Sequence, residues 1–338
     1  MKVTIKDVAR EAKVATSTVS RVLSNSDKIS EDTKDRVNRA IKKLNYVPNA
    51  IARGLANNKT NILAVVVPEG AENIFENSFF IQAMKGMSIY AEHKNYYLMY
   101  AFKDDSSNDE EWIKKFTGSN LVDGICLFRV KEDDKCIDYL KNIKFPFVVI
   151  GRPENIDDTL WVDNDNFKAM YDLVNLLLDR GHTKIAFIGA KKDLNVSIDR
   201  LRGYKEALFS RGKKVRDELI YLGKEFNKET GGIAVENILA KEEVSAIVVT
   251  DDMLAFGVQD KLKQLDREDI AIVGFNNVPL AAHRTPKLAS VDINSEDLGY
   301  YAAKLLINKI NNSDNRKKYY IINTKLVERE SLKDYEVK

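Results

Sequence analysis

A polar stripe near the start of the chain has side chains that suit hydrogen bonding to nucleic-acid bases. In the segment TSTVSRVLSN, residues 16–25, Val19, Val22 and Leu23 fall on one side of a helix. The opposite side carries Thr16, Ser17, Ser20, Arg21 and Asn25. Short hydroxyl and amide groups beside one bidentate arginine are the groups that read base edges in a DNA major groove. The alternative is a plain solvated face, because many polar helical stripes are only that.

Charge is distributed unevenly along the chain. The 338 residues include 53 Lys and Arg and 51 Asp and Glu, a formal net charge of +2. Within residues 1–60 the basic residues outnumber the acidic ones by about two to one, so the remainder is slightly acidic. A basic end is expected where that end faces phosphates, because neutralising phosphates releases counterions. The charge pattern therefore favours DNA over a solvated face.

Three short helices with apolar faces must position this stripe. The first and third have their apolar sets at helical spacing, Ile5, Val8, Ala9 and Ala12, then Val37, Ala40, Ile41 and Leu44. Thr4 is the expected N-cap of the first helix, with Asp7 three residues on. The break at residues 13–15 is too short for an antiparallel return, so the second helix must cross the first steeply. The sequence thus predicts a small all-α head.

Two tracts of this head resemble a known family. They read VTIKDVAREAKVATSTVSRVL and ISEDTKDRVNRAIKKLNYVPNAIARGLANNKT, and they are similar to the helix-turn-helix and hinge of the LacI/GalR family of bacterial transcription regulators. The resemblance implies a homodimer on double-stranded operator DNA, with the second helices in major grooves and the hinge segments in the central minor groove. It implies DNA contacts at Thr4, Thr16, Ser17, Ser20, Arg21, Asn25, Asn49, Ala52 and Leu55.

The hinge and two departures from the family pattern refine this expectation. Pro48 ends the third helix, Asn49 is a cap, and residues 50–56 form a helix too short to be stable alone, which should fold only on DNA. Leu55 is the expected wedge between base steps, unless it packs against its own domain. Lys13 replaces the family's usual Gly and Ala15 its usual capping Ser, so Thr16 is expected to cap the second helix as well.

The rest of the chain alternates short apolar runs with helical patterns. The runs are ILAVVV (62–67), GICLF (124–128), FVVIG (147–151), IAFIG (185–189), AIVVT (246–250) and IAIVGF (270–275). Fully apolar strands alternating with helices indicate parallel sheets covered on both faces. The fold class is therefore α/β.

Polar residues follow several of these runs, where doubly wound sheets bind ligands. Arg152, Asp251 and Asn276 each stand just after a run, and Asp252 and Asn277 come next. The sequence lacks GxGxxG and any phosphate loop. A guanidinium, carboxylates and carboxamides therefore favour a polyol or sugar over a nucleotide.

The family resemblance continues through the body. RGHTKIAFIG, DRLRGYKEAL, DDMLAFG, IVGFNN and LVERES are similar to a two-lobed periplasmic-binding-protein-like sensor. The resemblance implies ligand contacts at Phe79, Phe80, Arg152, Arg200, Phe226, Asp251 and Asn276. Trp161 either lines the cleft as well or packs in the hinge between lobes.

Alternatives stay open for several of these residues. Phe79 and Phe80 are core aromatics in the alternative reading, and Arg200 a surface ion-pair partner. Of Asp251 and Asp252, one is expected to cap the following helix and the other to face the ligand. His182 follows Gly181 at a helix end and is expected to be structural.

The expected domains are a DNA-binding head at 1–46, a hinge at 47–60 and a sensor at 61–338. Lobe one spans about 61–160 and 292–318, and lobe two about 161–291 and 319–338. The chain should cross between lobes near Trp161, Val291 and Lys318.

The expected function is sugar-controlled repression of a carbohydrate-utilisation operon. IGRPEN, TLWVDNDNFKAMYDL and SVDINSEDLGYYAAKLLINKI resemble the maltose-operon repressors of Gram-positive bacteria, which implies maltose or a related glucoside as effector. The alternative is a global catabolite regulator of the same family, co-activated by a phosphorylated partner protein. That role requires a basic docking patch, and residues 300–310 carry only Lys304 and Lys309.

Enzymatic and membrane roles are not expected. His93, His182 and His283 are scattered, without ligand or triad spacing, so we expect no metal, cofactor or catalysis. Two cysteines, Cys126 and Cys136, no signal peptide and no long apolar span indicate a cytoplasmic protein.

Overall fold

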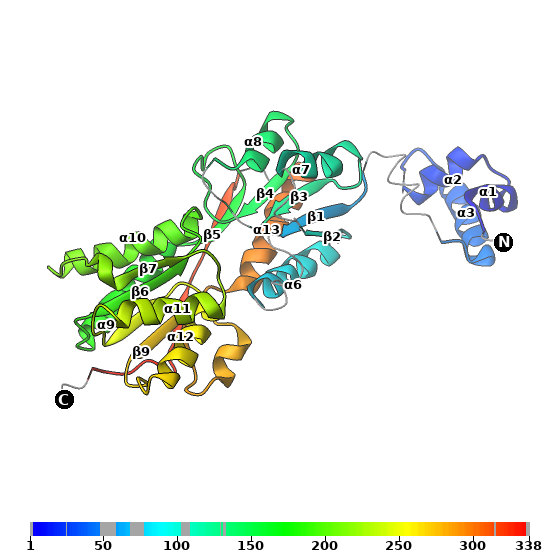
Figure 1. The fold of residues 1–338 in the computed structure, drawn as a ribbon. Coiled ribbons are helices and arrows are strands. Elements are labelled where there is room, and N and C mark those ends of the chain that lie inside the picture. Colours follow the sequence, from blue (N-terminus) through cyan, green and yellow to red (C-terminus); the bar gives the residue numbers. More distant parts are fainter. Residues whose placement is uncertain are drawn as a thin grey trace. The chain divides into compact units, whose positions relative to one another are not determined.

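The computed structural model describes residues 3–24, 26–47, 59–67, 78–102, 109–128, 130, 133–313 and 316–335. It divides into two compact units, Met1–Thr60 and Asn61–Lys338, which we call the head and the sensor (Figure 1).

The head contains the three predicted helices around one small core. They are α1 (Ile5–Ala12), α2 (Thr16–Leu23) and α3 (Glu31–Leu44). The core side chains are those of the predicted apolar faces, Val8, Ala9, Ala12, Val19, Val22, Val37 and Ala40. The prediction of a three-helix head is therefore confirmed.

The helices of the head differ in how well side chains cap their N-termini. Thr4 is the N-cap of α1, where its amide donates to the Asp7 carboxylate at 3.0 Å and its hydroxyl does so at 2.7 Å. The expectation that Thr16 caps α2 is wrong, because Thr16 is already helical and Ala15 occupies the N-cap position. Alanine has no side-chain acceptor, so the first amides of α2 lack a side-chain cap. Lys13 ends α1 at φ 55°, in the left-handed region that glycine adopts with less strain.

The described part of the sensor contains two six-stranded sheets. Sheet 1 has the order β11-β5-β4-β3-β1-β2, with all pairs parallel, and its strands are β1 (Ile62–Val67), β2 (Tyr97–Phe102), β3 (Gly124–Leu127), β4 (Phe147–Ile150), β5 (Trp161–Asn164) and β11 (Tyr319–Ile322). Sheet 2 has the order β12-β10-β9-β8-β6-β7, with only β12 antiparallel, and its strands are β6 (Ile185–Ala190), β7 (Ile220–Gly223), β8 (Ala246–Val249), β9 (Ala271–Phe275), β10 (Ala289–Asp292) and β12 (Lys325–Val327).

Helices cover both faces of each sheet, as near-continuous apolar strands require. Sheet 1 packs between the pair α6 (Ser78–His93) and α13 (Ser295–Ile310) and the pair α7 (Asp109–Gly118) and α8 (Lys135–Asn142). Sheet 2 packs between the pair α9 (Asn166–Asp179) and α10 (Asn195–Ser210) and the pair α11 (Lys228–Leu239) and α12 (Asp252–Gln264). Short 3-10 helices lie at η1 (Asp217–Leu219) and η2 (Pro279–His283). The α/β prediction is confirmed.

Glycines allow α6 and α13 to touch backbone to backbone. A Cβ on Gly86 would lie 1.8 Å from the Glu296 carbonyl oxygen, and one on Gly299 would lie 1.8 Å from the Ala83 carbonyl oxygen. Any side chain at either position would force the helices apart, so the two glycines are what let this pair pack as one close layer.

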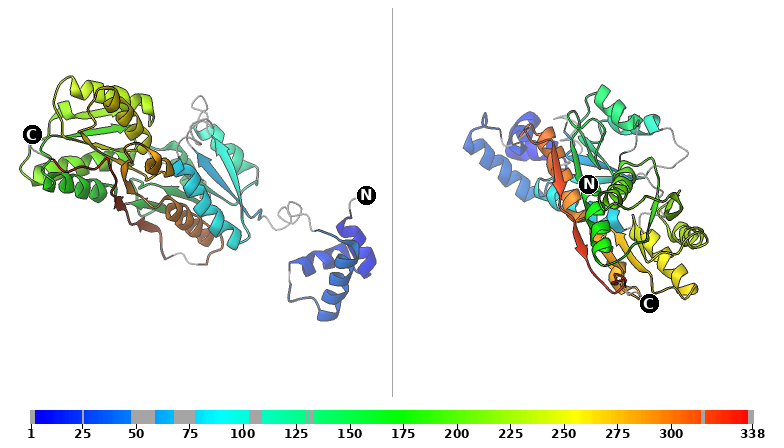
Figure 2. Two further views of the ribbon diagram at one scale, coloured as in Figure 1. Left: turned by 90° about the horizontal axis from the view of Figure 1, so that it is seen from below. Right: turned by 90° about the vertical axis from the view of Figure 1, so that its left-hand side faces the viewer.

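Two of the expected lobe boundaries are wrong by about four residues. β5 and β11 pair with each other in sheet 1, so the chain leaves lobe one after Asn164 and again after Ile322, rather than near Trp161 and Lys318. The remaining crossing follows Asp292, close to the expected Val291. Figure 2 shows β11 and β12 passing in succession from one lobe to the other. β5 ends in the polar residues Asp163 and Asn164, and β11 has only four residues, two of them tyrosines, so neither strand stands out as a long apolar run.

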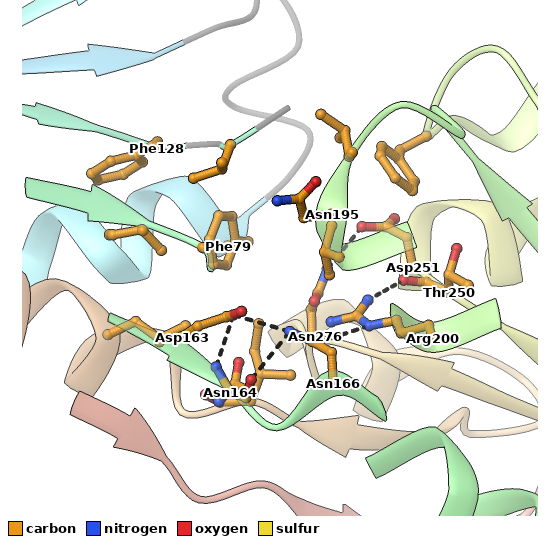
Figure 3. Close-up of a pocket in the computed structure, with 18 of the residues that line it drawn as sticks. Phe79, Phe128, Asp163, Asn164, Asn166, Asn195, Arg200, Thr250, Asp251 and Asn276 are labelled. Carbon is orange, nitrogen blue, oxygen red and sulfur yellow. Dashed lines mark hydrogen bonds between the residues drawn. The ribbon is translucent and has the colours of Figure 1, made fainter. Parts of the chain in front are cut away.

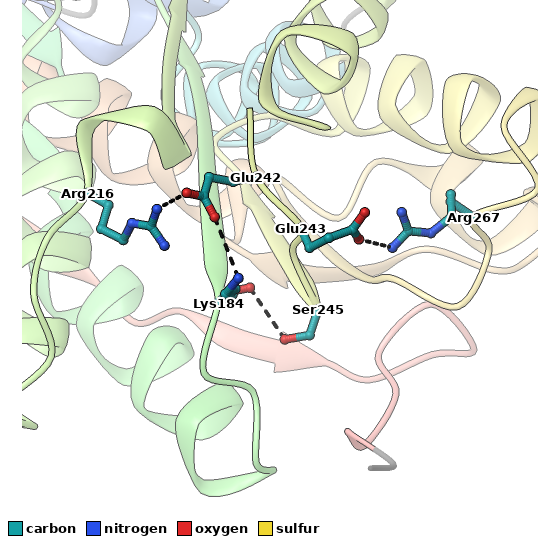
Figure 4. A network of polar contacts seen from close by, with 6 residues as sticks. All are labelled: Lys184, Arg216, Glu242, Glu243, Ser245 and Arg267. Carbon is teal, nitrogen blue, oxygen red and sulfur yellow. Dashed lines mark hydrogen bonds and ion pairs between the residues drawn. The ribbon is translucent and has the colours of Figure 1, made fainter. Parts of the chain in front are cut away.

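His182 has a structural role, as expected. It is 2% exposed, and its ring nitrogens lie 3.1 Å from the Ser245 hydroxyl and 2.9 Å from the Lys333 carbonyl oxygen. Ser245 in turn belongs to a polar network in which Glu242 pairs with Lys184 and Arg216 (Figure 4). His182 therefore links the start of sheet 2 to the C-terminal segment.

The uncapped start of α2 leads to a stability prediction. Ala15→Ser supplies a side-chain acceptor for the α2 amides, and it should stabilise this helix by about 1 kcal/mol. Amide hydrogen exchange in α2 should then slow about fivefold in the full-length protein, with no change in the sensor. Unchanged exchange in α2 would show that its first amides are already satisfied.

Candidate functional site

A cleft between the two lobes of the sensor collects polar side chains from both sheets (Figure 3). The carboxyl ends of β3, β4 and β5 face it from lobe one, and the segments after β8 and β9 face it from lobe two. Parallel strands end at a common edge, so this is where a doubly wound sheet exposes ligand-binding groups. The described residues that line the cleft are Phe79, Phe80, Phe128, Val130, Ile150, Gly151, Asp163, Asn164, Asn166, Leu194, Asn195, Val196, Arg200, Phe226, Thr250, Asp251, Asn276, Ile293 and Leu298.

Asp251 and Asn276 form the polar wall of lobe two. The Asn276 amide donates to the Asp251 carboxylate at 2.7 Å, while the other Asp251 oxygen accepts the Met253 amide at 2.7 Å. Asp251 is thus the N-cap of α12 and also lines the cleft. The expectation that one of Asp251 and Asp252 caps the helix while the other faces the ligand is wrong. Asp252 is fully buried, and its carboxylate accepts hydrogen bonds from the Val278 amide and the Ser290 hydroxyl.

Arg200 lies at the floor of the cleft as a buried cation. Only 5% of it is exposed. Its guanidinium donates to Asn166 at 3.0 Å and to the Thr250 carbonyl oxygen at 2.5 Å, and it stacks 4.3 Å from the centre of the Phe275 ring. The alternative of a surface ion pair is therefore wrong. Through these bonds, Arg200 links α9, α10 and the end of β8.

Asp163 and Asn164 bring the end of β5 into the cleft. Asp163 accepts the Asn164 amide at 2.8 Å and the Asn166 side chain at 3.0 Å, both on the same carboxylate oxygen. Asn164 donates to the carbonyl oxygens of Ile293 and Ile322 at 3.0 and 2.9 Å. Since Ile293 and Ile322 start the other two connections between the lobes, Asn164 ties all three together.

Burial shifts the acidity of the charged groups. Burial raises the pKa of Asp163 to about 6, against hydrogen bonding from Asn164 and the charges of Arg152 and Arg200. Burial lowers the pKa of Arg200 to about 10, although Asp251, Asp163 and Asp252 favour its charged form. Burial also raises the pKa of Asp252 well above its usual range. The cleft therefore holds an arginine cation among carboxylates in a low-dielectric setting.

Aromatic side chains form the apolar part of the wall. Phe80 is 6% exposed and stacks on Phe128 at 6.1 Å, and Phe79 meets Phe80 edge-on at 5.1 Å. Phe226 is half-buried against the core of lobe two. Phe79 and Phe80 thus belong both to the core of lobe one and to the cleft wall, so the two alternatives, core aromatics and cleft residues, hold together.

Two of the eight residues expected at the cleft, Arg152 and Trp161, are not among those that line it. Arg152 borders the cleft, since its guanidinium donates to the Asn164 carbonyl oxygen at 3.5 Å and stacks 5.6 Å from the Trp161 ring. Trp161 is 3% exposed, packs in the core between sheet 1 and α7–α8, and stacks on Tyr319 at 4.7 Å. Trp161 and Asp163 share one face of β5, but Trp161 begins the strand whereas Asp163 lies near its carboxyl end, so of the two only Asp163 reaches the cleft. The cleft wall includes the other six: Phe79, Phe80, Arg200, Phe226, Asp251 and Asn276.

Sequence reasoning missed several polar residues of the cleft. Asp163 and Asn164 end β5, a strand that is not part of a long apolar run in the sequence. Asn166 and Asn195 are the first residues of α9 and α10. Thr250 directly follows β8 and comes one residue before Asp251. Its hydroxyl is buried and has no hydrogen-bond partner among the described residues. These cleft residues could have been predicted from the polar residues that stand at strand ends and at the starts of the helices that follow.

The head presents the predicted polar stripe to solvent. Thr16, Ser17, Ser20 and Arg21 are all exposed on α2, whereas Val19 and Val22 are buried, and Thr4 is exposed at the start of α1. Four other predicted DNA contacts lie outside the described residues: Asn25, Asn49, Ala52 and Leu55. Most of the predicted hinge lies outside them too.

The described residues include neither a metal-ligand cluster nor a membrane-spanning helix. None of their His, Cys, Asp and Glu side chains form a group of three able to hold a metal ion. None of the helices in this part of the chain is both long and apolar enough to cross a membrane.

Comparison with known proteins places both units. Residues 4–49 match "Bacterial regulatory proteins, lacI family", and residues 174–332 match "Periplasmic binding protein-like domain". The chain is 34% identical over 321 residues to the HTH-type transcriptional regulator MalR of Streptococcus pneumoniae, covering 94% of this chain and 95% of that protein. It is 32% identical over 317 residues to catabolite control protein A of Priestia megaterium, covering 92% and 93% of the two chains.

A solved structure agrees over the full length. The transcriptional regulator CelR in complex with cellobiose superposes with a TM-score of 0.76 at 29% identity, covering 98% of this chain and 100% of that chain. The sequence motifs, the folds of both units and the similarity to these relatives all indicate the same family. The chain belongs to the lacI family of bacterial regulatory proteins, and it is a DNA-binding transcription regulator rather than an enzyme.

Proposed function

We propose that this regulator is a repressor of a carbohydrate-utilisation operon and that a small sugar in the sensor cleft controls it. The observation that carries the proposal is the pairing of Asp251 with Asn276 beside buried Arg200 and the aromatic wall. Sugars present hydroxyls that both donate and accept, around faces of C–H bonds. Carboxylates, carboxamides and a guanidinium satisfy the hydroxyls, while Phe226 and Phe79 cover the apolar faces.

In this proposal the sugar is a glucoside disaccharide, and maltose is the first candidate ligand. The similarity to MalR and the cellobiose bound by CelR support this class. Asn276 supports a neutral ligand, because a carboxamide both donates and accepts without adding charge. Thr250, with its unpartnered hydroxyl in the wall, offers one further bond to such a ligand.

The head binds operator DNA in this proposal, as part of a homodimer. Thr16, Ser17, Ser20 and Arg21 read base edges in the major groove, with Thr4 at the backbone. Exposure of these side chains over a buried apolar face supports this assignment. Asn25 and the hinge residues Asn49, Ala52 and Leu55 complete the contacts by family resemblance.

Coupling between the sugar and DNA follows from the connections between lobes. A ligand that bonds to both walls favours one spacing of the lobes, and the three connections near Asn164, Asp292 and Ile322 transmit that spacing through lobe one to the chain that leads to the head. Only a difference in sugar affinity between the two arrangements can change operator affinity.

The second candidate is a catabolite regulator co-activated by a phosphorylated partner protein. Similarity to catabolite control protein A favours it. Against it, Lys304 is engaged above the Tyr301 and Tyr320 rings at 5.5 and 5.8 Å, so Lys309 at the C-terminal end is the one other lysine of α13. A partner that raises operator affinity in the absence of sugar would establish this role instead.

A thermal-shift panel tests the proposal directly. Maltose, maltodextrins, cellobiose, sucrose, lactose, ribose and purines would each be added to the full-length protein. A ligand at one hundred times its Kd stabilises the native state by about 2.7 kcal/mol, so a cognate glucoside should raise Tm by several degrees. A shift with purines or ribose alone would refute the glucoside assignment.

Arg21→Ala tests the reading surface of the head. It should cost about 1–3 kcal/mol on an operator selected from random duplexes, because a bidentate contact to guanine is lost. Fluorescence anisotropy on selected and scrambled duplexes measures this, with Arg36→Ala as the control on α3. An equal loss on both duplexes would mean that Arg21 contacts only phosphate.

Asp251→Asn tests the cleft. The variant keeps the side-chain oxygen that caps α12 but removes the carboxylate, so disaccharide affinity should fall at least about tenfold, which is about 1.4 kcal/mol. Calorimetry measures the sugar, and anisotropy should find operator binding without sugar unchanged. Glu206→Gln, on the exposed side of α10, is the charge-matched control. Parental sugar affinity in Asp251→Asn would mean that the sugar binds elsewhere.

A further inference from the structure

A second hollow, of about 530 Å³, lies in lobe one at the end of sheet 1 opposite the cleft. The last turns of α8 and α13 line it, together with Phe147 at the start of β4, Leu160 just before β5 and Lys318 just before β11. The cleft is lined from the other ends of β4 and β5, and because these strands are parallel the two sites are separated by the length of the sheet. The elements that contribute these lining residues include α8, β4 and α13, which are labelled in Figure 1.

Positive charge dominates the rim of the hollow. Five lysines line it against two carboxylates, Asp157 and Asp158, and the five are Lys141, Lys144, Lys309, Lys317 and Lys318. Within the described residues none of these ammonium groups makes an ion pair. Lys318 donates to the Asp157 carbonyl oxygen at 2.7 Å, and Lys317 lies 4.0 Å above the Tyr320 ring. Like charges repel when held together, so an arrangement of this kind is favoured by an anion between them.

A buried hydroxyl points to the same conclusion independently. Thr159 lines the hollow and is only 2% exposed, and its Oγ1 is buried without a hydrogen-bond partner among the described residues. A buried polar group without a partner is costly, and such groups are retained where a ligand or ion satisfies them. The hydroxyl can donate to an anionic oxygen that the lysines neutralise.

Helix ends alone do not explain the lysines. Lys141 and Lys309 stand in the last turns of α8 and α13, where a cation is favoured by the helix dipole. Lys144, Lys317 and Lys318 lie outside those helices, yet they converge on the same hollow. The convergence therefore needs a cause beyond helix stability.

The floor of the hollow is apolar, which limits the kind of anion. Leu140, Phe147 and Leu305 are buried side chains that line it. Its size lies within the range of about 300–1,000 Å³ that small-molecule sites span. A DNA backbone, being convex, would meet the exposed lysines without reaching Thr159 at the floor.

We propose that this hollow is a second ligand site, which takes a phosphorylated small molecule such as a sugar phosphate. The phosphate lies among the lysines and accepts from Thr159, and the carbon skeleton covers the apolar floor. The site is separate from the sugar cleft, and it does not depend on the identity of the sugar bound there.

Calorimetry on the full-length protein tests this with three probes: glucose 6-phosphate, inorganic phosphate and glucose. Glucose 6-phosphate should bind at least tenfold more tightly than either of the others, and its affinity should fall as salt rises. The same titration in the Asp251→Asn background should give the same affinity, which separates this site from the cleft. Inorganic phosphate binding as tightly as glucose 6-phosphate would refute a site built for an organic phosphate.

Two variants locate the binding. Lys141→Gln with Lys309→Gln should weaken glucose 6-phosphate at least tenfold, whereas the exposed pair Lys115→Gln with Lys135→Gln should leave it unchanged. Thr159→Val keeps the shape of the side chain and removes the unpartnered hydroxyl, so it should weaken binding several-fold without lowering Tm.

Two further results would overturn the proposal: the absence of glucose 6-phosphate binding in the parent, and parental affinity in the Lys141/Lys309 variant. If that variant keeps its affinity for glucose 6-phosphate and loses affinity for non-specific DNA, the lysines serve a nucleic-acid backbone instead.

Discussion

The buried guanidinium of Arg200 is the constraint on which the sensor depends. A charge taken out of water is tolerated only when neighbouring groups compensate it, and here the compensation comes from three carboxylates and from bonds to Asn166 and the Thr250 carbonyl oxygen. These partners belong to different elements: the start of α9, the end of β8 and the start of α12. Arg200 therefore fixes the strand ends of lobe two, and it holds them against the end of β5 through Asn166 and Asp163.

The same arrangement explains why the cleft suits a neutral ligand with many hydroxyls. Its charges are largely balanced within the protein, and Asp251 and Asn276 already bond to each other. A ligand must then exchange bonds with these groups rather than neutralise them, which a polyol does well. Among the described residues, a group of lysines without ion pairs lies instead at the opposite end of sheet 1, around Thr159. The two ends of one sheet thus present different chemistry.

Sequence alone predicted the parts that rest on local patterns. The three head helices and most strands follow from apolar periodicity, and Asp251 and Asn276 were found because polar residues after apolar runs mark strand ends. It misplaced the lobe boundaries because β5 and β11 are four-residue strands, whose pairing joins segments far apart in the chain. Trp161 was left open between the cleft and the hinge, and the sequence could not decide, because its place at the start of β5 shows only once that strand is identified. The role of Asp252 could not be predicted, because its partners Val278 and Ser290 come from other loops.

The central claim is that a sugar in the cleft and the operator at the head are energetically coupled. Coupling of this kind is reciprocal, so it is measured by titrating the same disaccharide into the free protein and into the operator-bound protein. The account predicts two different sugar Kd values, and it predicts that their ratio equals the factor by which saturating sugar changes operator Kd. Identical sugar Kd values in the two titrations would contradict it, because the cleft would then be independent of DNA binding.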